Sequence, residues 1–382
     1  MKNQQCLVKG IVECIGLPEA YFHHRVAGEE EKQEPCKAEN HQEAIKLILD
    51  NLTNQDYGVI KNTSEIAAVG HRVVHGGEKF SQPVAITAEV IDDIRECFSL
   101  APLHNPPNYQ GIEAVNKLLP GVLQVAVFDT AFHQTIPPAA YIYGLPYAIY
   151  QKYNIRRYGF HGSSHQYVAT RAAEILNRPL TELRLITCHL GNGSSITAIA
   201  GGKSVDTSMG FTPLEGLVMG TRCGDIDPAI IPHILRYEHI SPDALYDLLN
   251  KKSGVLGISG ISNDMRALLK AESSGNSRAK LAIDVFCYRI KKYIGSYLAV
   301  LNGAEAIVFT AGIGENSPTV RERSCRDMEN LGIVLDKEKN LNTIAREGII
   351  SHENSPIKVL VIPTNEELLI ASETYKILTN KN

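Results

Sequence analysis

The sequence predicts a mixed α/β protein, because short apolar runs typical of buried strands alternate with longer segments of helical spacing. Glycine-rich turns follow several of these apolar runs, and no tandem repeat is present. With 382 residues, the chain is long enough for about two domains. A mixed α/β protein of two domains is therefore expected.

The first half of the chain begins with elements of modest length. The charged segment 29–40 contains Pro35 and is predicted to be an exposed loop. After it we expect a helix over 43–52, a buried strand over 66–69, a loop over 101–111, a helix over 112–119 and a strand over 122–129 that ends on Asp129. The segment from there to Tyr158 is rich in tyrosine and proline and is expected to be irregular.

The second half has stronger periodicity. Its expected elements are a helix over 166–177, strands over 185–188 and 196–200, a long helix over 280–302 ended by Gly303, and a strand over 306–310. Ser317 followed by Pro318 is typical of a helix N-cap with proline at the first helical position. A last strand and loop over 357–367 should lead into a closing helix from Glu367.

Composition excludes several classes of protein. The net charge of −4 leaves no basic footprint for nucleic acid or acidic lipid. Eight cysteines include no Cys-x-x-Cys pair, which argues against zinc ribbons and dithiol redox sites and fits free thiols in a reducing compartment. The N-terminal residues contain no apolar signal region, and no run approaches the ~18 apolar residues of a membrane span. A cytoplasmic protein is expected.

The most informative turn is GNGSS, residues 191–195, between the strands expected over 185–188 and 196–200. Glycines let a backbone approach a ligand closely, and successive N–H groups in a tight turn form a nest for anions such as phosphate. Asn-Gly is equally the strongest short signal for a plain β-hairpin. The turn alone leaves both interpretations open.

Three further stretches favour a ligand site. FTAGIGEN, residues 309–316, is expected to form a second Gly-x-Gly loop at a strand end, where α/β proteins usually bind ligands. HRVVHGGE, residues 71–78, and RRYGFHGSSH, residues 156–165, place arginines and histidines beside glycines. The chain has no Rossmann fingerprint, no P-loop and no protein-kinase motif set. The commoner nucleotide-binding classes are therefore excluded.

Taken together, the motifs resemble those of the acetate kinase (acetokinase) family, within the superfamily of sugar kinases, actin and chaperone ATPases. They follow the family's order over nearly the whole chain: HRVVHGGEKF, APLHNPPN, VAVFDTAFHQTIP, RRYGFHGSSH, HLGNGSS, DTSMGFTPLEGLVMGTRCGDIDP, FTAGIGENS and PTNEE. The resemblance implies two duplicated ribonuclease-H-like domains with a cleft between them, and a homodimer. It assigns 1–130 plus 367–382 to the acetate and magnesium side, and 131–366 to nucleotide binding and dimerisation.

One feature departs from the family's pattern. Members open with a strand and an Asn-x-Gly-Ser-Ser-Ser-x-Lys loop that binds phosphate and contributes to the magnesium site, and no such loop occurs in this sequence. VKGIVECIG, residues 8–16, is similar to the family's second strand region. We therefore expect either that the start was assigned too late or that this form lacks its first strand, with weak activity for the chain as printed.

The resemblance implies roles for four residues of the reaction centre. Phosphoryl transfer requires positioning and positive charge around the moving group, which Arg222 and His161 would supply. Arg72 would bind the substrate carboxylate in a two-pronged contact; the alternative is a surface ion pair. His161 could instead be an ordinary buried or capping histidine. Asp129 is the family's candidate acid or base, but an acetate ion has no proton to remove, so we expect Asp129 to orient Arg72 or hold metal-bound water.

Further residues are assigned to substrate and nucleotide by the same resemblance. A pocket for the methyl group would be formed by Val74, Leu103, Phe160 and Pro213, all of which could equally be core residues, and His104 would line the cleft. The ATP phosphates would contact His189, Leu190, Gly191, Asn192 and Gly193. The nucleoside would be held by Asp264, Met265, Arg266, Gly312, Ile313, Gly314, Glu315 and Asn316. Glu366 would ligate Mg²⁺, or Mn²⁺ in its place, unless it simply begins the last helix.

The function implied is ATP-dependent, reversible phosphorylation of acetate. Propionate kinase is the close alternative, since one extra methylene changes binding by only ~1–3 kcal/mol. A catalytically impaired nucleotide-binding protein is a second alternative, motivated by the missing loop. A structural metal protein built on the 13 histidines is the least favoured, because the i, i+4 pairs His71/His75 and His161/His165 lie in glycine-turn motifs.

Overall fold

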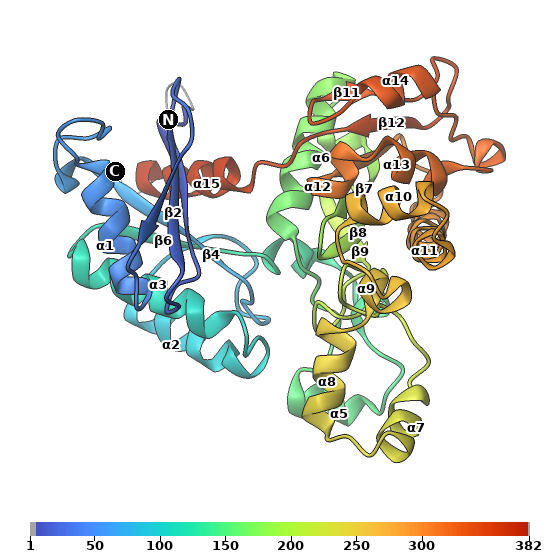
Figure 1. Cartoon of the computed structure of the whole chain (residues 1–382), viewed down its shortest axis with the longest axis horizontal. Helices are drawn as coiled ribbons and strands as arrows, with labels where there is room; N and C mark the ends of the chain where they lie inside the picture. The colour runs from blue at the N-terminus through green and yellow to red at the C-terminus, as the bar shows by residue number, and fades with distance from the viewer. Residues whose placement is uncertain (1–4, 381–382) are drawn as a thin grey trace. The chain divides into compact units, whose positions relative to one another are not determined.

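The computed structural model describes residues 5–380 (Figure 1). Its contacts divide the chain into two compact units, Met1–Ala131 with Glu367–Asn382, and Phe132–Glu366. Both units combine strands and helices. Within residues 5–380, no helix is both long and apolar enough to cross a membrane.

The first unit contains two small sheets. One is an antiparallel meander in the order β1 (Val8–Glu13), β2 (Ala20–Val26) and β3 (Lys32–Cys36). In the other, β6 (Leu123–Phe128) lies between a parallel β4 (Ala68–Val73) and an antiparallel β5 (Val84–Ala85). The helices of this unit are α1 (His41–Leu52), α2 (Ala88–Glu96), α3 (Asn105–Leu118) and α15 (Glu366–Asn380).

Three sequence predictions in this unit were wrong in part. The strand expected to be buried over 66–69 is β4, which spans Ala68–Val73 and in which only Val73 is buried. The segment 29–40 is not all loop, because Lys32–Cys36 pairs with Ala20–His24 and forms β3. The helix expected over 112–119 begins earlier, at Asn105, since prolines occupy its first positions, where the backbone N–H is not needed for helical bonding. The strand β3 forms because it pairs with β2, and α3 can start at Asn105 because proline is tolerated at the first positions of a helix. Neither feature follows from the spacing of apolar residues.

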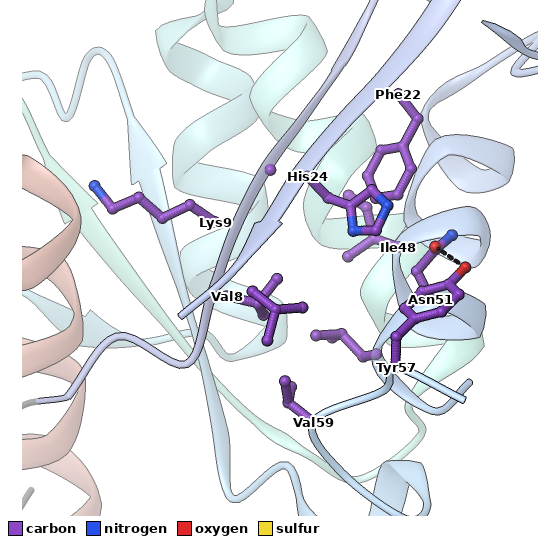
Figure 2. Close-up of a pocket in the computed structure, with 11 residues that line it drawn as sticks. Val8, Lys9, Phe22, His24, Ile48, Asn51, Tyr57 and Val59 are labelled. Atoms are coloured by element: carbon purple, nitrogen blue, oxygen red, sulfur yellow. Dashed lines mark hydrogen bonds between the residues drawn. The ribbon is translucent and has the colours of Figure 1, made fainter. Parts of the chain in front are cut away.

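The hairpin β1–β2 and helix α1 border an apolar cavity with a volume of about 240 Å³, shown in Figure 2. The ring of Phe22 stacks on that of His24 with the centroids 4.9 Å apart. The hydroxyl of Tyr57 donates to Asn51 Oδ1 at 2.8 Å. Within the described residues His24 Nε2 is buried without a hydrogen-bond partner. Packing on this side of the unit is therefore less complete than in an ordinary protein core.

The second unit is built on a six-stranded sheet in the order β11-β12-β10-β7-β8-β9. Its strands are β7 (Arg184–Leu190), β8 (Ser194–Ala200), β9 (Lys203–Thr207), β10 (Ala306–Thr310), β11 (Gly348–Ile349) and β12 (Lys358–Val361). The central strand β10 is parallel to both neighbours, β7 and β12. The carboxyl ends of these strands thus lie at one edge, where the glycine-rich segments begin.

Helices cover both faces of this sheet (Figure 1). Val168 of α6 (Gly162–Leu176) packs with Leu185 and Val308 on one face, while Phe286 of α11 (Ser277–Leu301) packs with Ile186 on the other. Because both faces are covered, β7, β8 and β10 read as nearly continuous apolar runs. The remaining helices are α4 (Pro138–Tyr141), α5 (Tyr147–Tyr153), α7 (Ile230–Tyr237), α8 (Pro242–Lys251), α9 (Gly254–Ser259), α10 (Met265–Ser273), α12 (Ala311–Asn316), α13 (Pro318–Cys325) and α14 (Lys337–Asn342).

Most predictions for this unit are confirmed. The strand β10 spans 306–310 as expected, and the Ser317 hydroxyl accepts a hydrogen bond from Val320 N–H, as an N-cap should. One correction concerns the Gly-x-Gly segment after β10, which is not a loop. It forms the short helix α12 directly on the strand end, with Ala311 in the left-handed region at a φ of 63°.

Candidate active site

The turn 191–193 joins β7 to β8, so the hairpin interpretation is confirmed by the pairing of Leu190 with Ser194. Gly191 N–H donates to the Gly193 carbonyl at 3.1 Å, and the Ser194 hydroxyl donates to the Gly191 carbonyl at 3.0 Å. From outside the hairpin, Gly220 N–H donates to the Asn192 carbonyl at 3.0 Å. These bonds hold the turn in one shape, which is what an anion nest requires.

A cavity with a volume of about 720 Å³ opens beside this turn. It brings together three segments that lie far apart in the sequence and that were assigned to ATP. Its lining includes Gly191, Asn192, Asp264, Met265, Arg266, Gly312, Ile313 and Asn316. The size is within the range of small-molecule sites, and its position at the carboxyl ends of β7 and β10 is where α/β proteins bind ligands.

Five other residues assigned to ATP do not line this cavity. Leu190 is fully buried in the core, and Gly314 is a buried residue of α12 that faces the ends of β7 and β10. The carboxylate of Glu315 accepts a hydrogen bond from Thr364 N–H at 3.0 Å and so anchors the segment before Glu366. His189 and Gly193 lie at the other end of the hairpin turn, beside His161.

The part of the cavity lined by Asp264 and Arg266 carries an exposed ion pair. Asp264 caps α10 by accepting from Arg266 N–H at 2.8 Å, and its carboxylate also pairs with the Arg266 guanidinium at 2.7 Å. Hydrogen bonds from Arg266 hold the pKa of Asp264 below its usual range. Since the Arg266 side chain is 91% exposed, the pair contributes little to folding stability and its guanidinium can move toward a ligand.

Two polar side chains lie over Gly193. A Cβ added to this glycine would lie 3.1 Å from Arg222 Nη1 and 3.5 Å from His161 Nε2. A larger residue would therefore displace one of them. The absence of a side chain at Gly193 lets a guanidinium and an imidazole approach the same turn that borders the cavity.

Arg222 is mostly buried and has no carboxylate within salt-bridge distance in the part of the chain that the structure describes. Its Nη1 donates to the Pro213 carbonyl at 3.4 Å and approaches Met219 Sδ at 3.9 Å. Burial lowers the pKa of Arg222. A cation paired only with weak neutral acceptors retains most of its attraction for an anionic ligand.

His161 precedes helix α6 and has a left-handed backbone, with a φ of 57°. This conformation is uncommon for a residue other than glycine, and it directs the imidazole toward the hairpin. The ring stacks on His189 with the centroids 4.1 Å apart, and Nδ1 lies 2.9 Å from the Ser195 hydroxyl. The motif GFHGSSH thus places a fixed histidine beside the Gly191–Gly193 turn.

In the first unit, Arg72 at the end of β4 pairs with Asp129 just past the end of β6. The guanidinium donates from Nε to Oδ1 at 3.1 Å and from Nη2 to Oδ2, so the contact is bidentate. Asp129 is only 1% exposed, whereas the Arg72 side chain is 46% exposed. Burial raises the pKa of Asp129, and the charges of Arg72 and His104 oppose that shift. The carboxylate therefore holds one edge of the guanidinium in place.

The residues assigned to the methyl pocket belong to both units. Val74 and Leu103 lie in the first, where Val74 is buried and Leu103 is 54% exposed. Phe160, which is buried, and Pro213, which is half-buried, lie in the second. His104, in the first unit, directly precedes α3. That these side chains together form a pocket for a methyl group stays a prediction.

Glu366 is the first residue of α15. This position is compatible with a role as a Mg²⁺ ligand and with a role as an acidic residue that begins the helix. Residues 5–380 contain no group of three or more His, Cys, Asp or Glu side chains arranged to hold a metal ion. That is compatible with Mg²⁺, which often takes one or two carboxylates and completes its shell with substrate phosphates and water. A single half-buried glutamate therefore fits the donor set for this ion.

Two residues with a structural part in the site were not predicted. Asn263 donates to Asn192 Oδ1 at 3.1 Å; its neighbour Asp264 in the motif SNDMR was the available signal. Arg321 is fully buried and donates to the carbonyls of Gly314 and Glu315, which ties α13 to α12. Nothing in the sequence around Arg321 indicates this role.

The sequence was compared with protein families and with characterised proteins. Residues 1–372 match the model of the Acetokinase family. An acetate kinase from Desulfitobacterium hafniense is 60% identical over 378 residues, which make up 99% of this chain and 94% of that protein.

Solved structures give the same result. The crystal structure of Porphyromonas gingivalis acetate kinase is 49% identical, has a TM-score of 0.94, and is matched over 98% of this chain and 94% of that one. A propionate kinase from Francisella tularensis is 44% identical, with a TM-score of 0.91 over 97% of this chain and 93% of that one. The predicted fold class, α/β with ribonuclease-H-like domains, is thereby confirmed.

Proposed function

This chain belongs to the acetokinase family, and we propose that it transfers the γ-phosphoryl group of ATP to acetate, forming acetyl phosphate and ADP in a reversible reaction. It is a phosphotransferase with a carboxyl group as acceptor.

The observation that carries the proposal is the Gly191–Gly193 turn. One end of it lines a cavity together with the segments assigned to the nucleoside, and the other end lies under Arg222 and His161. In phosphoryl transfer, negative charge is spread over the equatorial oxygens of the moving group, and catalysis depends on placing positive charge and N–H donors there. The Arg222 guanidinium, which has no acid partner within residues 5–380, and the positioned imidazole of His161 meet that requirement.

Acetate needs a binding group more than a base. Its carboxyl group is ionised at neutral pH, so one oxygen can attack phosphorus in line with the departing ADP without losing a proton. We assign Arg72 to the acetate carboxylate and Asp129 to orienting Arg72, because their two-pronged contact occupies one edge of the guanidinium. Val74, Leu103, Phe160 and Pro213 would contact the methyl group, and His104 would line the site.

The metal ion of the reaction would be Mg²⁺, with Glu366 as its protein ligand. When bound, it would neutralise charge on the β- and γ-phosphates. Glu315 would help to place Glu366 through its bond to Thr364 N–H.

Propionate is the alternative acceptor, and the likeness to a propionate kinase supports keeping it. The discriminating experiment measures initial rates of acyl hydroxamate formation with acetate, propionate and butyrate, at saturating ATP and Mg²⁺. We expect acetate to be fastest and propionate slower by roughly 10-fold or more. Fastest turnover of butyrate would contradict the pocket assignment, and no turnover of any acid would contradict the function.

We further propose a cytoplasmic homodimer, with Phe132–Glu366 as the nucleotide-binding and dimerising unit and Met1–Ala131 with Glu367–Asn382 as the acetate and magnesium side. Light scattering coupled to gel filtration tests the dimer. A monomer at micromolar concentration would contradict this part of the proposal.

A further inference from the structure

His161 is the first member of a chain of buried hydrogen bonds. Its Nδ1 lies 2.9 Å from the hydroxyl of Ser195 on β8. The same hydroxyl lies 2.8 Å from Nε2 of His165, one turn further along α6. Nδ1 of His165 lies 2.7 Å from the hydroxyl of Thr187 on β7. Three elements of the second unit thus converge behind the imidazole.

This row of hydrogen bonds is isolated from solvent behind His161. Ser195, His165 and Thr187 are all fully buried. Burial holds the pKa of His165 well below its usual range, and the charges of His133 and His189 lower it further. His165 is therefore neutral at neutral pH, with one ring nitrogen donating and the other accepting.

The number of protons available then allows only two directions of donation along this row of hydrogen bonds. If Thr187 donates to His165 Nδ1, His165 Nε2–H donates to Ser195, and the Ser195 hydroxyl donates to His161 Nδ1. If the direction is reversed, His161 Nδ1–H donates to Ser195, which donates to His165 Nε2, and His165 Nδ1–H donates to Thr187. Each hydroxyl and each neutral ring supplies one proton in either direction.

Both directions allow His161 to carry a proton on Nε2. In the first direction His161 is neutral and its only N–H is on Nε2. In the second, Nε2 is protonated only when His161 is an imidazolium with protons on both nitrogens. In either state Nε2–H lies near Gly193, where Arg222 Nη1 also lies.

We propose that Ser195 and His165 are positioning residues, which fix the His161 imidazole and keep a proton on Nε2 for a phosphate oxygen at Gly193. This inference rests on the proposed function for its catalytic meaning. Its structural content, the dependence of the His161 proton on the Ser195 hydroxyl, does not. Hydrogen-bond partners that orient metal-bound histidines are typically worth about 10- to 100-fold in activity, and we expect an effect of the same order at His161.

The test uses Ser195→Ala, with Ser195→Thr to restore the hydroxyl. Thr197→Val is the matched control, because Thr197 is a fully buried residue of the same strand whose hydroxyl bonds to Thr207 at 2.8 Å and not to a histidine. Acetyl hydroxamate formation gives kcat and KM. Nitrogen NMR of protein labelled on histidine, with ADP and inorganic phosphate bound, gives the protonation of each ring nitrogen. A His161→Gln sample assigns the His161 signals.

We expect Ser195→Ala to lower kcat by about 10- to 100-fold, with KM for ATP changed by less than about threefold. The His161 signals should change from protonated Nε2 to a mixture of tautomers. Ser195→Thr should recover at least part of both properties, and Thr197→Val should match the wild type in both.

The proposal is overturned if Ser195→Ala keeps wild-type kcat and wild-type His161 signals, or if Thr197→Val loses as much activity as Ser195→Ala. Should Ser195→Ala fail to fold, as judged by circular dichroism, the wild-type spectrum decides, because an unprotonated Nε2 in the ADP–phosphate complex overturns the proposal. A wild-type protein that forms no acetyl phosphate, yet whose His161 signals depend on Ser195, would refute the proposed function and leave the positioning role standing.

Discussion

The two units support their functional groups in different ways. In the second, β7, β8 and β10 are buried on both faces within a six-stranded sheet, and buried hydrogen bonds hold the imidazole of His161 from behind. In the first, the strands form two separate three-stranded sheets, β1 is mostly exposed, and a cavity remains beside β1 and β2. Arg72 lies at a strand end there and forms an ion pair with Asp129. A buried network of hydrogen bonds and an ion pair at a strand end are thus two ways of positioning a functional side chain.

The largest expected effect concerns Arg222 of the well-packed unit. Arg222→Ala should lower kcat for acetyl hydroxamate formation by about 10³-fold, because arginines that face a transferring phosphoryl group are worth at least that much. Arg236→Ala, which removes an exposed arginine on α7, is the control and should change kcat less than twofold. A loss below about tenfold for Arg222→Ala would remove Arg222 from the reaction centre.

The contrast in packing predicts a contrast in stability. Ile186→Ala in β7 should lower the free energy of unfolding by about 2–5 kcal/mol, because the side chain is fully buried and leaves a cavity. Ile11→Ala in β1 should change it by less than about 0.5 kcal/mol, since Ile11 is 54% exposed. Urea unfolding followed by circular dichroism measures both, as the chain has no tryptophan. Equal losses would show that β1 is as well packed as β7.

The Arg72–Asp129 ion pair of the first unit should affect mainly the kinetics with acetate, the phosphoryl acceptor. Asp129→Asn keeps the shape of the side chain but removes its charge, so the Arg72 guanidinium loses its fixed orientation. We expect kcat/KM for acetate to fall by about 10- to 100-fold, which corresponds to ~1.5–3 kcal/mol for hydrogen bonds to a charged group. KM for ATP should be nearly unchanged. An equal rise in KM for ATP would indicate a wider structural defect.

The smallest effect concerns acid stability, and it should appear in both units. Burial lowers the pKa of His133 in the second unit and of His71 in the first to about 4. In the unfolded chain their pKa is near 6.5, so below that pH only the unfolded state takes up the proton, and stability is lost as pH falls from about 6.5 to about 4. Between pH 7 and pH 5, each should cost about 2 kcal/mol.

His133→Gln and His71→Gln check this expectation. Each variant should show a smaller change in unfolding free energy between pH 7 and pH 5 than the wild type, measured by urea unfolding at both pH values. An unchanged pH dependence in either variant would mean that the histidine concerned is not kept neutral by burial.

Local signals in the sequence predicted a large part of the fold. The Asn-Gly turn between two apolar runs predicted the β7–β8 hairpin, Ser317-Pro318 predicted the start of α13, and the apolar run 306–310 predicted β10. Each of these depends on interactions within a few residues. The strand β3 was missed because its charged sequence has no strand pattern and it forms only by pairing with β2.

The site was predicted unevenly for the same reason. Motifs placed the segments around residues 191, 264 and 312 near a ligand, and the cavity brings all three together. They did not reveal that the Glu315 side chain turns away to Thr364, or that α12 is braced by Arg321. The direction of a side chain depends on contacts with residues distant in the sequence, and a short motif contains no information about those contacts.

The sequence by itself determined which local elements form, which glycine turns can approach phosphate, and which family the chain resembles, because caps, turns and periodicity act over a few residues. Only the tertiary structure decided that Gly193 lies beneath Arg222 and His161, that Asp129 holds Arg72, and that Ser195 joins His161 to His165. Arg72 and Asp129 are separated by 57 residues, and His161 and Ser195 by 34. Such contacts exist only once strands and helices have packed, and they set the positions, charges and protons on which the chemistry depends.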